Sequence, residues 1–209
     1  MVKRRNDFDR VAGYYDRLAG LVFGESLVKA QQALCDQIPT KKTILVAGGG
    51  SGAVLAALAA PKPKKLYYLE ASGKMMALAR KKAPDEDAIH WIHARMEDTD
   101  LPAADCLVTQ FFLDVFDRES VKQHIRRLAA HVPAGGYWLY ADFLPAADVR
   151  PSQRLVLWAM LKFFRASVSL SAKAITNHLP LIEAQGFTRV AHELHVNGMV
   201  QVCLLRKGN

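Results

Sequence analysis

Long apolar runs are lacking in this sequence of 209 residues. No window reaches the roughly 18 consecutive apolar residues of a membrane span, so we expect no transmembrane helix. Cysteine is scarce as well: the three cysteines form no CxxC pair and no Cys/His cluster with zinc spacing. We therefore expect no bound metal, and we predict a reducing, cytoplasmic compartment. The basic start of the chain runs into an acid at Asp7 and not into an apolar segment, which argues against a secretion signal.

Acidic residues are fewer than basic ones. The chain has 28 Lys and Arg against 20 Asp and Glu, a net charge of +8, which could attract RNA or an anionic membrane face. The basic residues come in short groups such as Arg80–Lys82, and no aromatic side chains are interleaved with them as single-strand binding would favour. We interpret these groups as solvated helix ends and loops, and we find no strong nucleic-acid signal.

Apolar strand-like runs alternate with helical patterns along most of the chain, whose 51% hydrophobic content is that of a globular protein. The runs predict strands over 43–47, 65–70, 89–93, 106–109 and 137–141, and helices over 53–60, 74–83 and 121–132. Such alternation is typical of a parallel sheet. Two further β-rich runs, 188–195 and 199–205, flank Asn197-Gly198 and predict a closing antiparallel hairpin. The sequence therefore predicts one three-layer α/β domain.

A glycine-rich turn, Gly48 to Gly52, follows the first predicted strand. Glycine permits positive φ and close approach of a ligand, and the start of a following helix offers unpaired amides. Glu70 lies twenty residues beyond Gly50, at the end of the next strand, where a carboxylate can accept two hydrogen bonds from a ribose. The combination indicates a nucleoside cofactor.

Two cofactors fit this turn. Gly48-x-Gly50-x-x-Ala53 could be a dinucleotide fingerprint, whereas Gly48-x-Gly50-x-Gly52 is the pattern of an S-adenosylmethionine turn. No tyrosine is followed by a lysine four residues later, so the catalytic pair of short-chain reductases is absent. A closing hairpin also has no reason to exist in the dinucleotide fold. We therefore favour S-adenosylmethionine.

Nearly the whole chain resembles the class I S-adenosylmethionine-dependent methyltransferases. The segments that carry the resemblance are Ile44–Gly52, Glu70–Met76, Cys106–Leu113, Pro133–Gly136 and Gln185–Phe187. The resemblance implies a Rossmann-like three-layer sandwich with a mostly parallel seven-stranded sheet and an antiparallel C-terminal hairpin. It also implies a single domain over 1–209, with an N-terminal helical cap over 1–40 and a helical insertion on the acceptor side over 143–186.

The resemblance also assigns cofactor-binding residues. Gly48, Gly50 and Gly52 would form the cofactor turn, Glu70 would hold the ribose, and Ala71 beside it would also bind the cofactor. The remaining positions would surround the adenine and the reactive methyl group: Met75 and Met96 for the adenine, Gln110 and Phe111 for the methyl.

The segment Phe8–Asp16 is similar to the N-terminal region of the small-molecule branch, including quinone-biosynthesis methyltransferases, and implies that Tyr14 helps to enclose the methionine part of the cofactor. Two positions depart from the family pattern. Val46 stands where an acid usually orders the turn, and Arg95 stands where an acid often bonds the adenine amine, with Glu97 or Asp98 as alternatives if the alignment slips.

Methyl transfer is an in-line displacement, so the protein mainly aligns the acceptor and excludes water, and a base is needed only where the acceptor must lose a proton. Asp114 and Asp142 are candidate catalytic residues because they follow the fourth and fifth strands, at the edge where open α/β sheets bind ligands. The simpler interpretation is that Asp114 or Asp117 caps a helix and that Asp142 faces solvent. His178 could also be a base, although a surface or helix-end position is the simpler interpretation.

The segment Leu155–Phe164 has Lys162 as its single polar residue and follows Pro151-Ser152, a plausible helix start. A helix that is apolar all round must be covered on every side. One interpretation is core packing plus a homodimer contact. The other is a lid over an apolar acceptor such as a quinone.

These observations predict an S-adenosylmethionine-dependent methyltransferase acting on a small, apolar acceptor. One alternative is an RNA methyltransferase, which would explain the charge but lacks an Asn/Asp-Pro-Pro-Tyr-like motif after the fourth strand. The other is a degenerate member that uses the fold as a binding scaffold, suggested by Val46 and Arg95.

Overall fold

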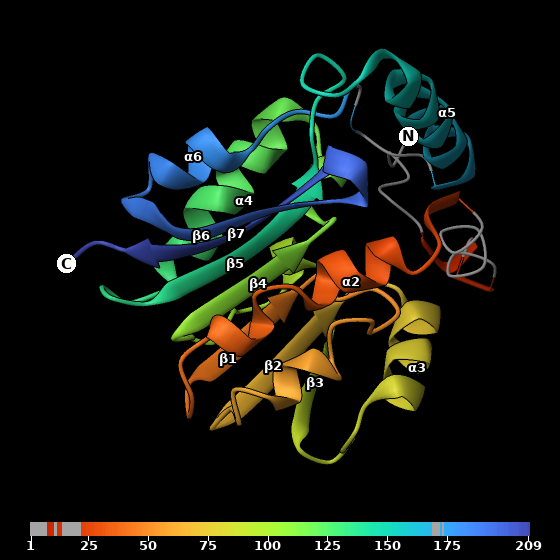
Figure 1. Cartoon of the computed structure of the whole chain (residues 1–209). Helices are drawn as coiled ribbons and strands as arrows, with labels where there is room; N and C mark the ends of the chain where they lie inside the picture. Colours follow the sequence, from red (N-terminus) through yellow and green to blue (C-terminus); the bar gives the residue numbers. More distant parts are fainter. Residues whose placement is uncertain (1–7, 11, 14–21, 169–171, 173) are drawn as a thin grey trace.

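The structure is a computed structural model that describes residues 8–10, 12–13, 22–168, 172 and 174–209. Its seven strands form one sheet in the order β3-β2-β1-β4-β5-β7-β6 (Figure 1). The strands are β1 (Thr43–Ala47), β2 (Lys65–Glu70), β3 (Ile89–His93), β4 (Cys106–Gln110), β5 (Tyr137–Phe143), β6 (Phe187–His195) and β7 (Val200–Lys207). The first five pair in parallel, and β7 pairs antiparallel with both β5 and β6. The predicted Rossmann-like, mostly parallel seven-stranded sheet with an antiparallel C-terminal hairpin is confirmed.

Two apolar cores, one on each face of the sheet, make the three layers. One face is covered by α4 (Arg118–Ala130) and α6 (Leu179–Glu183), the other by α2 (Ser26–Gln32) and α3 (Gly73–Lys82) (Figure 1). The amphipathic stripe of α4 supplies Val121, Ile125, Leu128 and Ala129 to its core, at the spacing that the sequence predicts. β1, in the middle of the sheet, is buried on both faces because both layers pack on it.

The helix predicted over 53–60 is wrong. The segment is a series of turns around a short 3-10 helix, η3 (Ala57–Ala59). Its amides bond mostly three residues back, as between the amide of Leu55 and the carbonyl of Gly52, so no regular α-helix follows the glycine turn. The two prolines at 61 and 63 leave too little chain for a long helix, and the apolar side chains of Val54, Leu55 and Leu58 are instead buried in the core.

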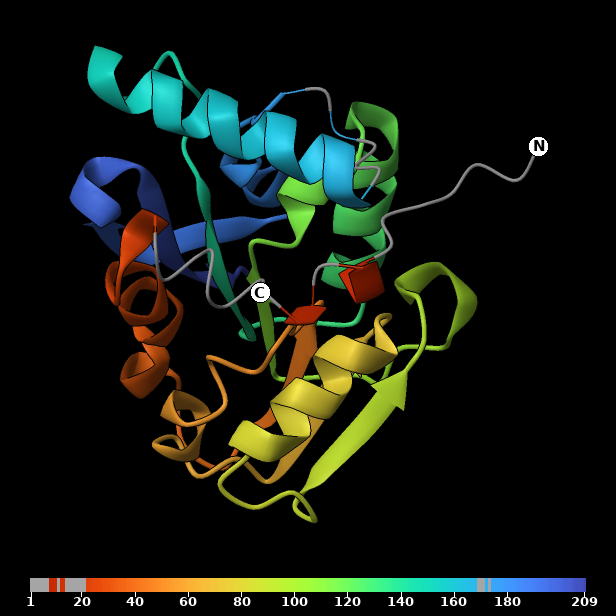
Figure 2. The same cartoon turned by 90° about the vertical axis from the view of Figure 1, so that its right-hand side faces the viewer.

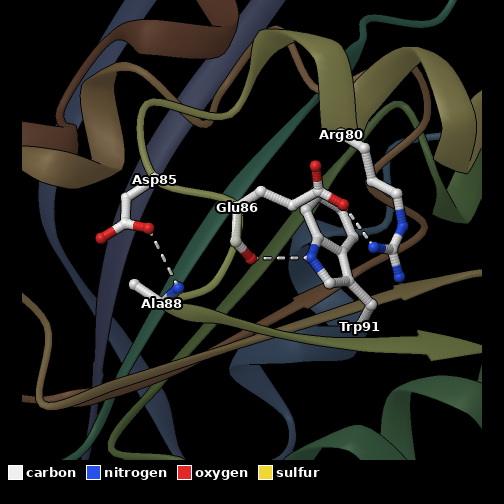
Figure 3. Close-up of polar contacts among 5 residues, drawn as sticks. All are labelled: Arg80, Asp85, Glu86, Ala88 and Trp91. Atoms are coloured by element: carbon white, nitrogen blue, oxygen red, sulfur yellow. Dashed lines mark hydrogen bonds and ion pairs between the residues drawn. The ribbon is translucent and has the colours of Figure 1, made fainter.

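Side-chain contacts hold the loop between α3 and β3 against β3, away from the glycine turn (Figure 3). The Trp91 indole nitrogen donates a hydrogen bond to the carbonyl of Glu86 at 3.1 Å. The Arg80 guanidinium forms an ion pair with the carboxylate of Glu86 and lies 4.8 Å from the centre of the Trp91 ring. These contacts connect the end of the helix to the strand that follows it.

α5 (Pro151–Val168) lies beyond the carboxyl ends of β4 and β5, in the region where the sequence predicts a helical insertion (Figures 1 and 2). It contacts the short 3-10 helix η1 (Phe8–Arg10), which in turn contacts α3. Leu157 is buried in the core, but Leu155 and Trp158 are exposed, so the expectation that this apolar helix is covered on every side is wrong. Among the described residues, no helix is long and apolar enough to cross a membrane.

Candidate cofactor and acceptor site

The glycine turn bends sharply at the carboxyl end of β1. Gly48, Gly50 and Gly52 have φ values of +68°, +60° and +85°, which side-chain-bearing residues rarely adopt. The amides of Gly48 and Gly49 both donate to the carbonyl of Leu69 on β2, at 2.9 and 3.2 Å. The bend is therefore attached to the neighbouring strand without the helix that the sequence predicts after it.

Three of the four glycines pack against other parts of the protein. A Cβ atom on Gly48 would lie 1.9 Å from the Phe112 ring, one on Gly49 would lie 2.1 Å from the Tyr68 ring, and one on Gly52 would lie 2.7 Å from the backbone of α3. A Cβ atom on Gly50 would meet no described residue within 4 Å. Protein atoms therefore fill the space beside three of the glycines, and the space beside Gly50 is free of described residues.

The Glu70 carboxylate faces this open position. Its Oε2 accepts a hydrogen bond from the amide of Gly50 at 2.8 Å, and its Oε1 accepts one from the amide of Ser72 at 2.7 Å. Burial raises the pKa of Glu70, while the amide hydrogen bonds lower it. Because each carboxylate oxygen can accept a second hydrogen bond, the group retains acceptor capacity toward a ligand.

The start of α3 is attached to the N-terminal part of the chain. Ser72 is the N-cap of α3, and its hydroxyl oxygen accepts from the amide of Met75 at 3.1 Å. Asp9 on η1 accepts hydrogen bonds from the Ser72 hydroxyl at 2.5 Å and from the Lys74 amide at 3.1 Å, and these bonds lower the pKa of Asp9. η1 therefore lies directly beside the helix that follows Glu70.

The other residues that the resemblance assigns to the cofactor differ in their burial. Met75 on α3 and Met96 on the 3-10 helix η4 (Met96–Asp98) are both buried, whereas Ala71, next to Glu70, is exposed. Tyr14 lies outside the described residues. Val46 is buried in β1, and Arg95 immediately precedes η4, so neither position supplies an acid to the site.

Gln110 is the last residue of β4, and Phe111 follows it. The Gln110 amide nitrogen donates to the carbonyl of Gln31 on α2 at 2.6 Å, while its Oε1 is buried and has no hydrogen-bond partner among the described residues. Phe111 has a φ of +53°, a strained conformation for an aromatic residue. Its ring lies 5.2 Å from that of Phe143, which lies 5.6 Å from that of Phe23, so three aromatic rings from distant segments gather here.

Asp114 and Asp142 are brought together as a buried acid pair beyond β4 and β5. Their carboxyl groups are within hydrogen-bond reach of one another, and no donor among the described residues reaches Oδ1 of Asp114 or Oδ2 of Asp142. Asp142 is fully buried and Asp114 partly exposed. The alternative that Asp142 faces solvent is therefore wrong, and Asp117, not Asp114, caps α4.

The acid pair has perturbed acidities. Burial raises the pKa of Asp114 to about 6, and burial together with the neighbouring charge of Asp114 raises the pKa of Asp142 well above its usual range. Two carboxyl groups this close cannot readily both ionise, so they share one proton near neutral pH.

His178 is not a surface residue. It is buried at the start of α6, and burial lowers the pKa of its imidazole to about 4, so the ring is neutral near pH 7. Tyr140 is buried on the same side of β5 as Asp142, and burial followed by the charges of Asp142 and Asp114 raises its pKa. His178 is the N-cap residue of α6, so the helix-end alternative is confirmed, the surface alternative is wrong, and its role as a base stays a prediction.

The chain matches known proteins over this same region. Residues 44–136, from β1 to the turn before β5, match the family model described as a methyltransferase domain. This match covers a little less than half of the 209 residues. Methyltransferases of this family are dependent on S-adenosylmethionine, which confirms the predicted enzyme class and cofactor at the level of the family. No curated protein sequence matches the chain.

Solved structures of methyltransferases share the fold over nearly the whole chain. Magnesium protoporphyrin IX methyltransferase from Synechocystis PCC 6803, with bound SAH, has a TM-score of 0.72 and 14% identity, covering 97% of this chain and 98% of that one. An O-methyltransferase family 2 protein from Planctomyces limnophilus, in complex with apigenin, has a TM-score of 0.72 and 18% identity, covering 95% and 62%. The N-methyltransferase NodS from Bradyrhizobium japonicum, with SAH, has a TM-score of 0.65 and 13% identity, covering 90% and 88%.

The methyltransferase domain has features that the motifs alone did not indicate. Asp9 lies in a segment that resembles the family, but only the fold shows that it binds the start of α3. Phe112, which packs on Gly48, and Gln31, which holds Gln110, are likewise assigned by tertiary contacts. For Phe112, Gly48 is a partial signal in the sequence, because an aromatic ring can approach the backbone closely only where no Cβ atom is present.

Proposed function

We propose that this protein transfers a methyl group from S-adenosylmethionine to a small, apolar acceptor. The observation that carries the proposal is the Glu70 carboxylate, held by the amides of Gly50 and Ser72 so that it faces the single open glycine of the bend. A carboxylate at the end of β2 beside such a bend is suited to accept hydrogen bonds from the two hydroxyl groups of a ribose.

The residues present fit S-adenosylmethionine at this place. The space beside Gly50 admits a ligand close to the backbone, Glu70 retains acceptor capacity, and the buried Oε1 of Gln110 has no hydrogen-bond partner in the described part of the chain. Met75 on α3 and Met96 on η4 are buried apolar side chains that would contact the adenine. When bound, the cofactor supplies a methyl group on a positively charged sulfur.

Three aromatic rings support an apolar acceptor. Phe111 follows β4, Phe143 ends β5, and Phe23 reaches the same cluster from the N-terminal part of the chain. Such a cluster at the carboxyl ends of the strands buries an aromatic or isoprenoid molecule and excludes water from the reacting atoms. An acceptor of the quinone type, as in the branch that the N-terminal segment resembles, fits this chemistry.

The acid pair is suited to remove a proton from the acceptor. Near neutral pH the partly exposed Asp114 is ionised, and the fully buried Asp142 holds the shared proton. Asp114 would take up the proton that an acceptor hydroxyl or amine loses on methylation, so that the methylated product would leave the site neutral.

Titration calorimetry with S-adenosylhomocysteine tests the cofactor site. Glu70→Gln replaces one acceptor oxygen by a donor, so we expect at least about a tenfold loss of affinity, given the strength of hydrogen bonds to charged groups. Glu86→Gln, in the exposed loop before β3, is the matched control and should bind like the wild-type protein. No binding to the wild-type protein up to millimolar ligand would favour the scaffold alternative.

Transfer of a labelled methyl group to a panel of apolar phenols and hydroquinones tests the role of the acid pair. Asp114→Asn should retain affinity for S-adenosylhomocysteine but lower turnover about a hundredfold, the usual effect of removing a general base. Turnover of the wild-type protein should fall as the pH drops below about 6, following the pKa of Asp114. Unchanged turnover in Asp114→Asn would leave the pair a structural role only.

A further inference from the structure

α5 presents apolar side chains to solvent that the core does not need. Leu155 is 68% exposed and Trp158 is 59% exposed, on successive turns of the same helix. Leu157 and Met160, on the opposite side, already pack against the core. One buried apolar face is sufficient to hold a helix on the protein surface, so the exposed apolar side chains of α5 indicate a surface that contacts a binding partner.

Basic residues flank this outer face. Arg154 and Lys162 are exposed and share one side of the helix with Leu155 and Trp158, because the spacings are those of adjacent turns. The Lys162 ammonium group lies 5.7 Å from the centre of the Trp158 ring. We call these four residues, Arg154, Leu155, Trp158 and Lys162, the outer face of α5.

Acidic residues are missing from the whole surrounding segment. Between Asp148 and Glu183 the sequence has five basic residues and no Asp or Glu. An apolar face with tryptophan and a basic border, without a compensating acid, is the chemistry of helices that lie in the headgroup region of anionic bilayers. A protein partner or a second copy of this chain would give no reason for the absence of acids over so long a segment.

We propose that the outer face of α5 docks on an anionic lipid surface, with Leu155 and Trp158 inserted among the headgroups and the two cations on lipid phosphates. Binding is peripheral, since no described helix can span a bilayer. Because α5 lies beyond the carboxyl ends of β4 and β5, docking brings this edge of the sheet close to the lipid (Figure 2). The proposal does not depend on the methyl-transfer activity.

Flotation of the full chain with lipid vesicles tests the proposal. We expect binding to vesicles of equimolar phosphatidylcholine and phosphatidylglycerol, weaker binding to phosphatidylcholine alone, and loss of binding at high ionic strength. The double variant Leu155→Ser/Trp158→Ser should bind the anionic vesicles at least about tenfold more weakly, because two large apolar side chains no longer insert. Arg154→Ala should weaken binding about fivefold.

Matched controls separate the outer face from general effects of charge and hydrophobicity. Val190→Ser removes an equally exposed apolar residue from β6, and Lys81→Ala removes an exposed cation from the far end of α3. Both should bind like the wild-type protein. Equal binding of wild-type protein and the double variant would overturn the proposal, as would the absence of vesicle binding.

Two other occupants are distinguished by the same variants. If light scattering shows a wild-type dimer that Leu155→Ser/Trp158→Ser converts to a monomer, the face is a contact between copies and the lipid proposal is wrong. If Arg154→Ala abolishes binding to an oligoribonucleotide while no variant changes vesicle binding, the surface recognises nucleic acid, and the proposal again fails.

Discussion

Gly50→Ala is the most direct test of where the cofactor lies. Gly50 has a φ of +60°, and a Cβ atom added there would meet nothing within 4 Å. Alanine can therefore occupy the position without a collision, at a cost of about 1 kcal/mol for holding a left-handed conformation. Its methyl group would project into the space that we assign to S-adenosylmethionine.

Gly186→Ala is the matched control. Gly186, in the turn between α6 and β6, has a φ of +86° and is also surrounded by nothing within 4 Å of an added Cβ atom. Both substitutions therefore cost about the same backbone strain, which should lower the Tm of each variant by about 2–4 °C. They differ in their place in the fold, because Gly186 is remote from the bend after β1.

Thermal unfolding with and without S-adenosylhomocysteine, followed by titration calorimetry, distinguishes the two positions. A methyl group in a well-packed site costs about 1–3 kcal/mol, so Gly50→Ala should lose at least about tenfold in affinity. Gly186→Ala should bind with wild-type affinity. If both variants lose stability alike and Gly50→Ala binds as tightly as the wild-type protein, the cofactor does not lie beside Gly50 and the proposed site is refuted.

Three further predictions concern the acid pair, the bend and the start of α3. Burial raises the pKa of both carboxyl groups above their values in the unfolded chain, so the folded protein binds more protons and loses stability as the pH rises from 5 to 8. Urea unfolding at each pH should show that Asp142→Asn removes part of this loss, up to about 1.4 kcal/mol per pH unit. Gly48→Ala should unfold the protein or lower its Tm far more than Gly50→Ala, since the new methyl would overlap the Phe112 ring, and Phe112→Ala in the same chain should recover part of the loss. Ser72→Ala should cost about 1 kcal/mol in urea unfolding through loss of the α3 cap, and an unchanged stability would contradict the capping geometry.

The sequence predicted the central strands of the sheet well because these strands are buried on both faces. Such strands appear as continuous apolar runs, and the run Thr43–Ala47 matches β1 residue for residue. It failed at 53–60, where an apolar and helix-favouring composition forms turns because its side chains fill the core beside the bend. Local propensity could not show this, since the competing term is tertiary packing.

The candidate site was predicted in part. Glu70 was indicated by its distance from the glycine turn, a spacing that a βαβ unit fixes. Asp114 and Asp142 were placed at the same edge of the sheet, yet their burial and their shared proton could not be read from positions 28 residues apart. Asp9, 63 residues before Ser72, gave no local sign of its contact with the start of α3.

The amino-acid sequence by itself determined the order of the strands along the chain, the closing hairpin, the position of the glycine turn and the acid that faces it, because these depend on local periodicity and short spacings. Only the tertiary structure decided which glycine stays open, which carboxyl groups share a proton and which side of α5 remains exposed. Those properties arise from contacts between segments far apart in the chain, where burial and neighbouring charge act across the sheet.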